Sequence, residues 1–366
     1  MINTDELRAT LALQSISGIS TILARKLLTH YGTALEIWDK IPRNEGLPNG
    51  ISPKLVEKFI NKSPLDRADM TLEKTINSGD QMLHWQDVNY PNHLRQCIDA
   101  PLLLFARGSY RFDHRPVISI VGTRECSAYG ENFLDSFVSG LTSHNPLIVS
   151  GFAKGIDIYA HLTALDHGLD TVACLGHGFD KIYPVAHKVH QDRLVNSGLF
   201  LTEYSRGSSV LPMNFVSRNR IIAGLSEVTV VIQSAQTGGS LITASLANSY
   251  NREVMALPGR IDDPKSAGCN NLIKQNKAAV LTSAQDLIRL MGWEEKESRP
   301  KPQIDLSLTD PDQRQIADFL VDHPKAHIDQ IMTATSMKSQ RLQVVLLEME
   351  MTGLVKALPS RMFSLT

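Results

Sequence analysis

Short apolar runs alternate with amphipathic segments along the middle of the chain. Runs of strand length occur at 117–122, 147–151, 171–176, 199–204, 228–234, 253–259 and 278–283. Helical patterns separate them, and strands that alternate with helices are typical of parallel βαβ units with both sheet faces covered. The pattern therefore predicts an α/β domain with a Rossmann-like parallel sheet at 66–293.

The flanking segments predict two smaller domains. Residues 1–65 form short helical patterns, and the turn at 16–20 is similar to a helix-hairpin-helix element in which Ser20 replaces the second glycine. This pattern fits both a helical packing module and an element that contacts DNA. A charged linker with prolines at 294–308 precedes helices and a terminal hairpin at 309–366, which predict a winged helix.

Charge limits the kind of nucleic-acid contact that these domains can make. The net charge is −1, which argues against a basic coat over the whole protein. Residues 116–290 hold 14 Lys+Arg and 14 Asp+Glu, so an anion site there needs clustered positive charges. The last domain holds 6 Lys+Arg and 7 Asp+Glu, which favours a protein contact or a structural role, although Lys338 and Arg341 leave DNA binding open.

Other features of the composition favour a cytoplasmic protein. No apolar stretch is long enough to span a membrane, and the polar N-terminal residues do not resemble a signal peptide. The cysteines are far apart in the sequence and form no CxxC pair, so we expect reduced, buried thiols. They are Cys97, Cys126, Cys174 and Cys269.

Glycine-rich turns follow the first two predicted strands of the parallel sheet. The first strand ends at Gly122 and leads to Arg124, and the second ends at Ser150 and Gly151 and leads to Lys154. Turns after parallel strands meet at one sheet edge, where helix N-terminal amides and basic side chains can bind phosphate. The two turns therefore predict one positive ledge.

Two further segments add to this ledge. The stretch 215–220, FVSRNR, opens a helix in which Arg218 and Arg220 point in different directions, so one can reach the ledge while the other braces the fold. Phe215 can stack on a base or pack in the core. The later GGSLITA turn places Ser240 and Thr243 on one face of a helix start, where hydroxyls and amides suit phosphate.

The motifs together identify a family resemblance. The chain carries IVGTR, CLGHGFDKIYP, LTEY, FVSRNRIIAGLS, GGSLITA and REVMALPGRIDDPKSAGCNNLIK in this order, and so resembles the DNA-processing protein A (DprA/Smf) family. The strand before GGSLITA departs from the family pattern, because it ends near Gln233 where an acidic residue is usual.

The resemblance implies an extended Rossmann fold, a homodimer formed through that domain, and binding of single-stranded DNA. It implies protection of incoming DNA and loading of the RecA recombinase during natural transformation. We expect no cofactor, no metal and no enzymatic activity. Groove residues carried over from the family are Arg124, Phe215, Arg218, Ser240 and Thr243, and the ledge argument adds Lys154. The complete predicted DNA-binding set is Gly122, Arg124, Ser150, Gly151, Lys154, Phe215, Arg218, Asn219, Arg220, Gly239, Ser240 and Thr243.

Two other functions fit the same ledge. One is a nucleotide-binding sensor, and the other is an enzyme that processes nucleoside monophosphates with a glutamate near a PGGxGT turn. The GGSLITA turn has no such glutamate nearby, since Glu253 follows the helix. Without it, no side chain is available there for general acid–base catalysis. His187 and His190 could share a helix face, but no other ligand pattern completes a metal site.

Overall fold

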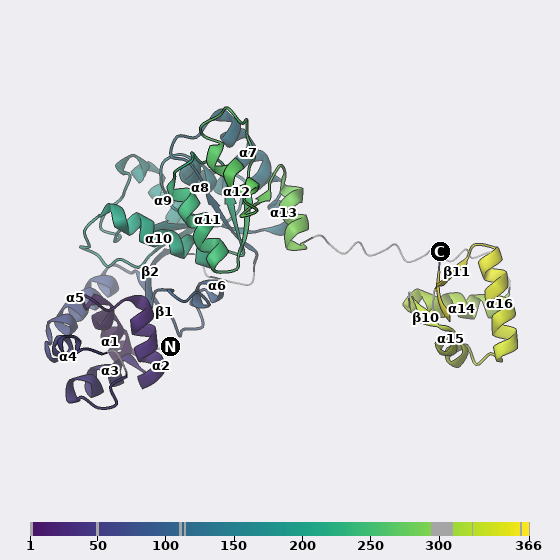
Figure 1. The fold of residues 1–366 in the computed structure, drawn as a ribbon, viewed down its shortest axis with the longest axis horizontal. Helices are drawn as coiled ribbons and strands as arrows, with labels where there is room; N and C mark the ends of the chain where they lie inside the picture. Colours follow the sequence, from purple (N-terminus) through teal and green to yellow (C-terminus); the bar gives the residue numbers. More distant parts are fainter. Residues whose placement is uncertain are drawn as a thin grey trace. The chain divides into compact units, whose positions relative to one another are not determined.

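The computed structural model describes residues 3–48, 51–109, 112, 115–293, 310–323, 325–358 and 361–365. The chain divides into two compact units, Met1–Met291 and Gly292–Thr366 (Figure 1). The predicted α/β domain and the N-terminal helices together make up the first unit, and the predicted winged helix lies in the second.

A nine-stranded sheet forms the centre of the first unit, in the order β1-β2-β6-β5-β4-β3-β7-β8-β9. The seven strands from β3 to β9 are mutually parallel, as the sequence pattern predicts. The strands are β1 Gln81–His84, β2 Leu103–Gly108, β3 Val117–Val121, β4 Leu147–Ser150, β5 Thr171–Leu175, β6 Gly198–Thr202, β7 Val228–Val231, β8 Glu253–Ala256 and β9 Ala279–Val280.

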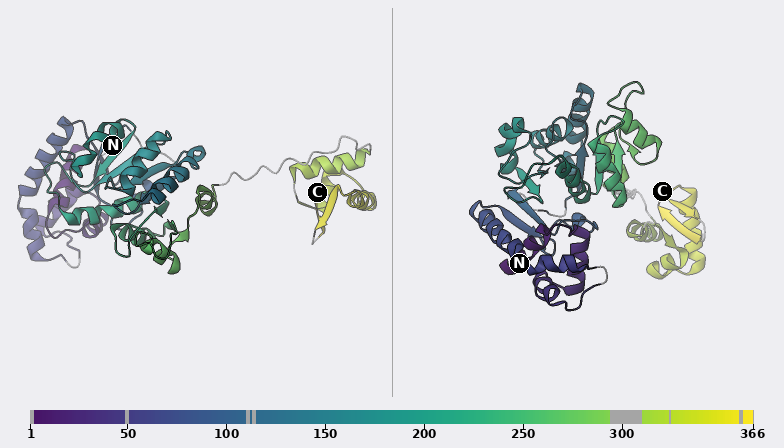
Figure 2. Two further views of the ribbon diagram at one scale, coloured as in Figure 1. Left: turned by 90° about the horizontal axis from the view of Figure 1, so that it is seen from above. Right: turned by 60° about the vertical axis from the view of Figure 1, so that its left-hand side comes forward.

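Helices cover both faces of this sheet (Figures 1 and 2). Apolar side chains of α10 and α11 pack on one face, and those of α8 and α9 pack on the other. Central strands such as β3 and β5 are buried along their whole length, which explains their continuous apolar sequence. The helices are α6 Asn92–Arg95, α7 Ala128–Ser139, η2 Thr142–His144, α8 Ile156–Asp166, η3 Val185–His190, α9 Gln191–Asn196, α10 Pro212–Leu225, α11 Gly239–Ser249, α12 Ala267–Lys274 and α13 Ala284–Met291.

Two antiparallel strands extend the sheet beyond the strands that the sequence pattern identifies. Strand β1 pairs with β2, and β2 pairs with β6, both in antiparallel register. Leu103 and Phe105 of β2 are buried against the N-terminal helices. These strands lie at the end of the sheet and interrupt the strand–helix alternation, so the βαβ pattern does not reveal them.

The N-terminal helices, purple in Figure 2, pack at the β1–β2 end of the sheet. Leu11 of α1 and Leu72 of α5 share a core with Phe105 of β2, so the helices and the sheet form one compact unit. Ser20 caps α2 by accepting a hydrogen bond from the Leu23 amide at 3.2 Å. The helices are α1 Thr4–Ser15, α2 Thr21–Tyr31, α3 Ala34–Lys40, η1 Ile41–Arg43, α4 Pro53–Ile60 and α5 Ser63–Asn77.

The second unit has the order of elements expected of a winged helix. Its small core includes Ile316, Ile331 and Leu346, one from each of its three helices. A three-stranded sheet in the order β10-β12-β11 completes it. The elements are α14 Pro311–Asp322, β10 Ala326–His327, α15 Ile328–Thr335, α16 Ser339–Met351, β11 Val355–Leu358 and β12 Met362–Leu365.

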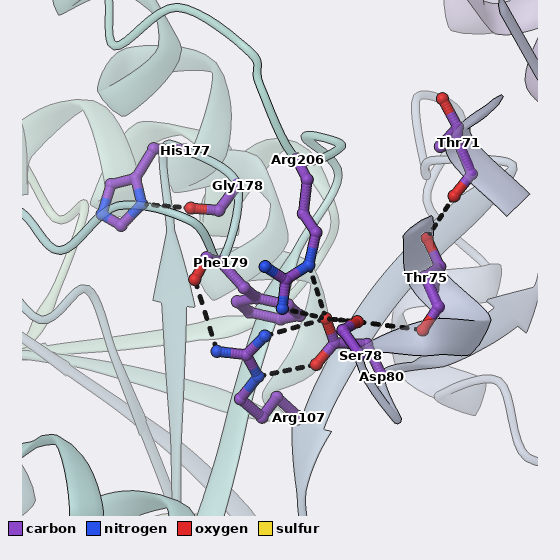
Figure 3. Close-up of polar contacts among 9 residues, drawn as sticks. All are labelled: Thr71, Thr75, Ser78, Asp80, Arg107, His177, Gly178, Phe179 and Arg206. Atoms are coloured by element: carbon purple, nitrogen blue, oxygen red, sulfur yellow. Dashed lines mark hydrogen bonds and ion pairs between the residues drawn. The ribbon is translucent and has the colours of Figure 1, made fainter. Parts of the chain in front are cut away.

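A buried carboxylate fastens the β1–β2 end of the sheet to loops at the edge where the parallel strands end (Figure 3). Asp80 accepts hydrogen bonds from Arg107 at 2.6 and 2.8 Å, from Arg206 at 3.1 and 3.0 Å, and from Ser78 at 2.6 Å. Arg107 also donates to the Phe179 carbonyl at 3.3 Å and lies 4.7 Å from the centroid of its ring. The Asp80 carboxylate therefore holds two arginines that position two different loops.

The charge of Asp80 should stabilise the fold in a pH-dependent way. Burial by itself would raise the pKa of Asp80, but hydrogen bonds from Arg107 and Ser78 outweigh it and lower the pKa below its usual value. We expect Asp80→Asn to lower the free energy of unfolding by about 3 kcal/mol near neutral pH, because two arginines lose their partner. Urea unfolding followed by circular dichroism measures this difference.

The sign of the pH dependence follows from the lowered pKa. The stabilisation is present above the unfolded-state value of about 4 and is lost as the pH falls through the folded-state pKa. The gap between wild type and Asp80→Asn should therefore narrow below about pH 4. Asp69→Asn is the matched control, because its ion pair with Arg8 is exposed and should contribute less than about 1 kcal/mol. A gap that stays constant into acid would contradict this assignment.

Candidate nucleic-acid interface

A pocket opens where the connections of the sheet change direction. Strand β3 lies between β4 and β7, so the chain continues to one side of β3 first and to the other side later. Ligands of open α/β sheets bind at such switch points, beyond the carboxyl ends of the strands. Here the pocket has a volume of about 310 Å³. Its position follows from the strand order and not from any single motif.

Four segments line the pocket. They are the turn after β3, the start of α8 and the residues before it, one side of α10, and the turn after β7 with the start of α11. Of the predicted residues, those in the lining are Gly122, Arg124, Phe215, Arg218, Asn219, Gly239, Ser240 and Thr243. The structure thus brings together residues that are up to 121 positions apart in the sequence. Ser150, Gly151, Lys154 and Arg220 are not part of the lining.

The glycines of the first two turns pack the turns against each other. A Cβ on Gly122 would lie 2.5 Å from Cγ1 of Ile156, the first residue of α8. Gly155 has a φ of +76°, and a Cβ there would clash with the Thr123 carbonyl, which also accepts a hydrogen bond from the Ile156 amide at 3.1 Å. These contacts explain why both positions are glycine, whether or not a phosphate also comes close to the backbone there.

Arg124 is the basic side chain of the lining that is free to meet a ligand. It is exposed and lines the pocket. Its guanidinium makes no ion pair or hydrogen bond to the part of the chain that the structure describes. Lys154 is also exposed, but it lies outside the pocket and near His187, whose pKa it helps to lower, after the larger effect of burial. The exposed positive charge of the pocket lining is therefore that of Arg124.

Arg218 lies at the base of the pocket and is only 4% exposed. Its Nη1 donates to the carbonyl of Gly151, which directly follows β4, and to that of Cys174, near the end of β5. The buried Asp157 carboxylate lies beside it, and burial raises the pKa of Asp157 while Arg218 opposes this shift. Nε of Arg218 is buried with no hydrogen-bond partner among the described residues. Arg218 therefore braces the strand ends and keeps one donor unused.

Arg220 faces away from the pocket. It donates to the Asp99 carbonyl and to the Glu203 carboxylate, and its side chain is 13% exposed. This contact ties α10 to the loops before β2 and after β6. Of the two arginines at i and i+2, Arg218 lines the pocket and Arg220 braces the fold, so the structure gives no support for a ligand contact by Arg220.

The start of α11 offers backbone amides more readily than hydroxyls. Gly238 provides no side-chain cap, so the first amides of α11 are not capped by the residue that precedes the helix. Ser240 is buried and donates to Oγ of Ser234 at 2.9 Å, and Thr243 is buried with its hydroxyl 3.4 Å from the Gly239 carbonyl. The hydroxyls line the pocket, but their hydrogen bonds are local.

Asn219, Ser150 and Gly151 also have structural partners. Nδ2 of Asn219 donates to the Gly239 carbonyl at 3.3 Å and so joins α10 to the start of α11. The Ser150 hydroxyl donates to the Ile120 carbonyl at 2.6 Å between β4 and β3. Gly151 has no room for a Cβ, which would clash with Asp157 and lie 2.7 Å from Nη1 of Arg218. Asn219 thus shapes the lining itself, whereas Ser150 and Gly151 support the pocket from behind.

Phe215 takes part in both packing and the pocket. Its ring is half-buried and lines the pocket. A Cβ on Gly176 would lie 3.0 Å from Cδ1 of Phe215, and the Tyr183 ring centroid is 5.2 Å from that of Phe215. One part of the ring therefore packs on the turn after β5, while another part faces the pocket. The packing interpretation is thus confirmed for one part of the ring, and stacking of a base on the other part stays a prediction.

The sequence analysis is wrong on one point about this pocket. It finds no carboxylate near the GGSLITA turn, yet Asp157 lines the same pocket from the start of α8. The residue is 82 positions earlier in the sequence than Gly239, so only the fold brings the two together. The Gly-Ile-Asp stretch at 155–157, in the turn after a predicted strand, is the signal that could have indicated it.

Two features are absent from the described residues. No group of three or more histidine, cysteine or acidic side chains there is placed to hold a metal ion. Within the same ranges, none of the helices combines the length and the apolar character needed to cross a membrane. The cysteines are all free thiols, and all but the half-buried Cys126 are buried.

Comparisons with known proteins agree with the motif pattern. Residues 81–292 match the family model of the DNA recombination-mediator protein A, and residues 297–361 match that of the DprA winged helix domain. Protein Smf of Synechocystis is 35% identical over 288 residues, which is 77% of this chain and 72% of that protein.

Solved structures of the same family are also similar. The crystal structure of DNA processing protein A from Streptococcus pneumoniae has a TM-score of 0.66 and 32% identity, and the match covers 79% of this chain and 98% of that one. The protein from Helicobacter pylori, described for its unique mode of single-stranded DNA binding, has a TM-score of 0.51 and 28% identity over 58% of this chain and 96% of its own. The chain therefore belongs to the DNA recombination-mediator protein A family, also called DprA/Smf.

Proposed function

We propose that the pocket at the carboxyl ends of β3 and β7 binds single-stranded DNA. The observation that carries the proposal is the exposed Arg124 guanidinium on the same pocket as the uncapped start of α11 and the half-buried Phe215 ring. A guanidinium and helix amides bind phosphate, and an aromatic face stacks on a base. The family's Helicobacter pylori member, described as binding single-stranded DNA, supports the same substrate.

The residues of the pocket have different roles in this proposal. Arg124 pairs with a phosphate, the amides at the start of α11 position a second oxygen, and Phe215 stacks on a base. Arg218 acts mainly from below, where its buried charge contributes to the potential and its Nε has no hydrogen-bond partner among the described residues. Ser240, Thr243 and Asn219 hold the α11 start in place, and Lys154 attracts the strand outside the pocket.

The wider biological role is part of the proposal. Family membership supports a cytoplasmic, non-enzymatic homodimer, formed through the sheet domain, that protects incoming DNA and loads the RecA recombinase during natural transformation. Two grooves in one dimer would raise avidity through effective concentration. Residues 66–293 would bind DNA, and residues 294–308 would link this domain to the winged helix. The flanking domains at 1–65 and 309–366 would contact DNA or protein.

A small nucleotide is the second candidate ligand of this pocket. The observation that favours it is the buried Asp157 carboxylate in the lining, next to Arg218. A carboxyl group there could accept a hydrogen bond from a ribose hydroxyl. Thermal stabilisation by nucleoside monophosphates, with no stabilisation by oligonucleotides, would favour a nucleotide sensor or a nucleotide-processing enzyme.

The proposal predicts a preference for single strands that depends on Arg124. Oligo-dT should bind more tightly than a matched duplex, because the bases of a duplex are not free to stack on the ring. Arg124→Ala should weaken oligo-dT binding by about 1.5–3 kcal/mol, the usual contribution of a hydrogen bond to a charged group. It should also reduce the slope of log affinity against log salt by about 0.7.

Fluorescence anisotropy at several salt concentrations measures these effects. Arg8→Ala is the matched control, because Arg8 is a surface arginine of α1 paired with Asp69. It should leave the affinity for oligo-dT unchanged. Equal affinity for both substrates, or an Arg124→Ala variant that binds like wild type, would refute the proposal.

Arg218 should affect stability far more than Arg124 does. Arg218→Met leaves the Asp157 carboxylate and two carbonyls without their partner, so we expect a loss of about 3–5 kcal/mol in the free energy of unfolding. Arg124→Ala should change this quantity by less than about 0.5 kcal/mol. Adding Asp157→Leu to Arg218→Met should recover part of the loss, since the unpaired charge is then removed. Urea unfolding of the three variants tests this, and a stable Arg218→Met would show that the bracing role is wrong.

A further inference from the structure

An exposed tyrosine extends the aromatic surface of the pocket. Tyr183 lies between β5 and η3 and is 50% exposed. Its ring centroid is 5.2 Å from that of Phe215, with an angle of 50° between the planes. Tyr183 itself is not part of the pocket lining, whereas Phe215 is. The two rings thus form a continuous aromatic surface that leads from the pocket to the outside.

The segment that carries Tyr183 is suited to a polyanion with exposed bases. Residues 181–190, KIYPVAHKVH, contain two lysines and no acidic residue. Both lysines, Lys181 and Lys188, are exposed, and Lys154 is exposed nearby, close enough to influence the pKa of His187. Exposed positive charge beside an exposed aromatic ring is the combination with which proteins hold single strands.

The aromatic pair is held in place by contacts that do not involve its exposed faces. Lys181 donates to the Ser208 carbonyl at 3.0 Å, which ties the loop of Tyr183 to the loop that leads into α10. Arg107 binds the Phe179 carbonyl and stacks on the Phe179 ring of the same loop, and Asp80 fixes Arg107 (Figure 3). A ring that is already positioned loses little conformational entropy when a base stacks on it.

We propose that Tyr183 is a second base-stacking position, which receives the base next to the one held at Phe215 as the strand leaves the pocket. This inference rests on the proposed single-stranded DNA binding and extends it along the η3 segment. The occupant is a nucleobase of the bound strand, because the surface is continuous with the phosphate pocket and two exposed lysines lie on the same segment. A protein partner at this surface is an outcome that the experiment distinguishes.

The experiment compares two probes and three variants of the full chain. The probes are oligo-dT and an oligonucleotide of the same length whose sugars all lack bases. The variants are Tyr183→Ala, Tyr183→Leu, which keeps an apolar side chain without a ring, and Tyr183→Phe as the conservative control. Anisotropy gives the affinities, and thermal melting verifies that each variant is folded.

Stacking predicts that Tyr183→Ala and Tyr183→Leu weaken oligo-dT binding by roughly 5- to 150-fold, while Tyr183→Phe binds like wild type. On the oligonucleotide without bases, all three variants should bind like wild type, since no base remains to be stacked. If Tyr183→Ala has a lower melting temperature than wild type, the affinities of Tyr183→Leu and wild type are compared instead.

Other outcomes overturn the inference in distinguishable ways. If Tyr183→Ala and Tyr183→Leu both bind oligo-dT as tightly as wild type, Tyr183 does not contact the DNA. The exposed ring would then be assigned to a contact with a protein partner. Equal losses on both probes mean that the ring acts on the backbone path or on the fold. In both cases Arg124→Ala would still weaken binding and the proposed function would stand. A wild-type chain that binds no oligo-dT would refute both proposals together.

Discussion

The pocket depends on one buried guanidinium. Arg218 is 4% exposed, and it bridges the carbonyls at the ends of β4 and β5 beside the buried Asp157 carboxylate. A buried charge is costly unless it is paired and hydrogen-bonded, so this arrangement fixes α10 against the sheet edge. Phe215 is three residues earlier on the same helix, and its position therefore follows from where Arg218 is held. The constraint at the base of the pocket determines the geometry at its rim.

A second ionic cluster controls the other side of the same edge. Asp80 holds Arg107 and Arg206, and these reach the loops after β5 and β6 (Figure 3). The carboxylate precedes β1, in the part of the unit that connects the N-terminal helices to the sheet. The antiparallel strands β1 and β2 are thus more than an extension of the sheet, because they carry the groups that position the loop of Tyr183.

The different roles of the predicted residues follow from how exposed their side chains are. Arg124 and Lys154 are exposed and available to a polyanion, whereas Arg218, Ser240 and Thr243 are buried and already hydrogen-bonded. Arg220 is bound to Glu203 on the side of α10 away from the pocket. Many of the residues that carry the family motifs therefore maintain the shape of the site, and few of them are free to contact a ligand. This difference separates residues that should affect stability from residues that should affect binding alone.

The sequence by itself determined the α/β class, the seven parallel strands, the winged helix, the family, and eight of the residues that line the pocket. These features are local or depend on chain order, because apolar runs and glycine turns act within a few residues. The tertiary structure alone decided which arginine faces the pocket, that Asp157 joins it, and that β1 and β2 complete the sheet. Each of these depends on contacts between distant positions, such as Arg220 with Asp99 and Arg107 with Asp80. A helical spacing of two residues shows that two side chains diverge, but only the packed neighbours decide which one meets the ligand.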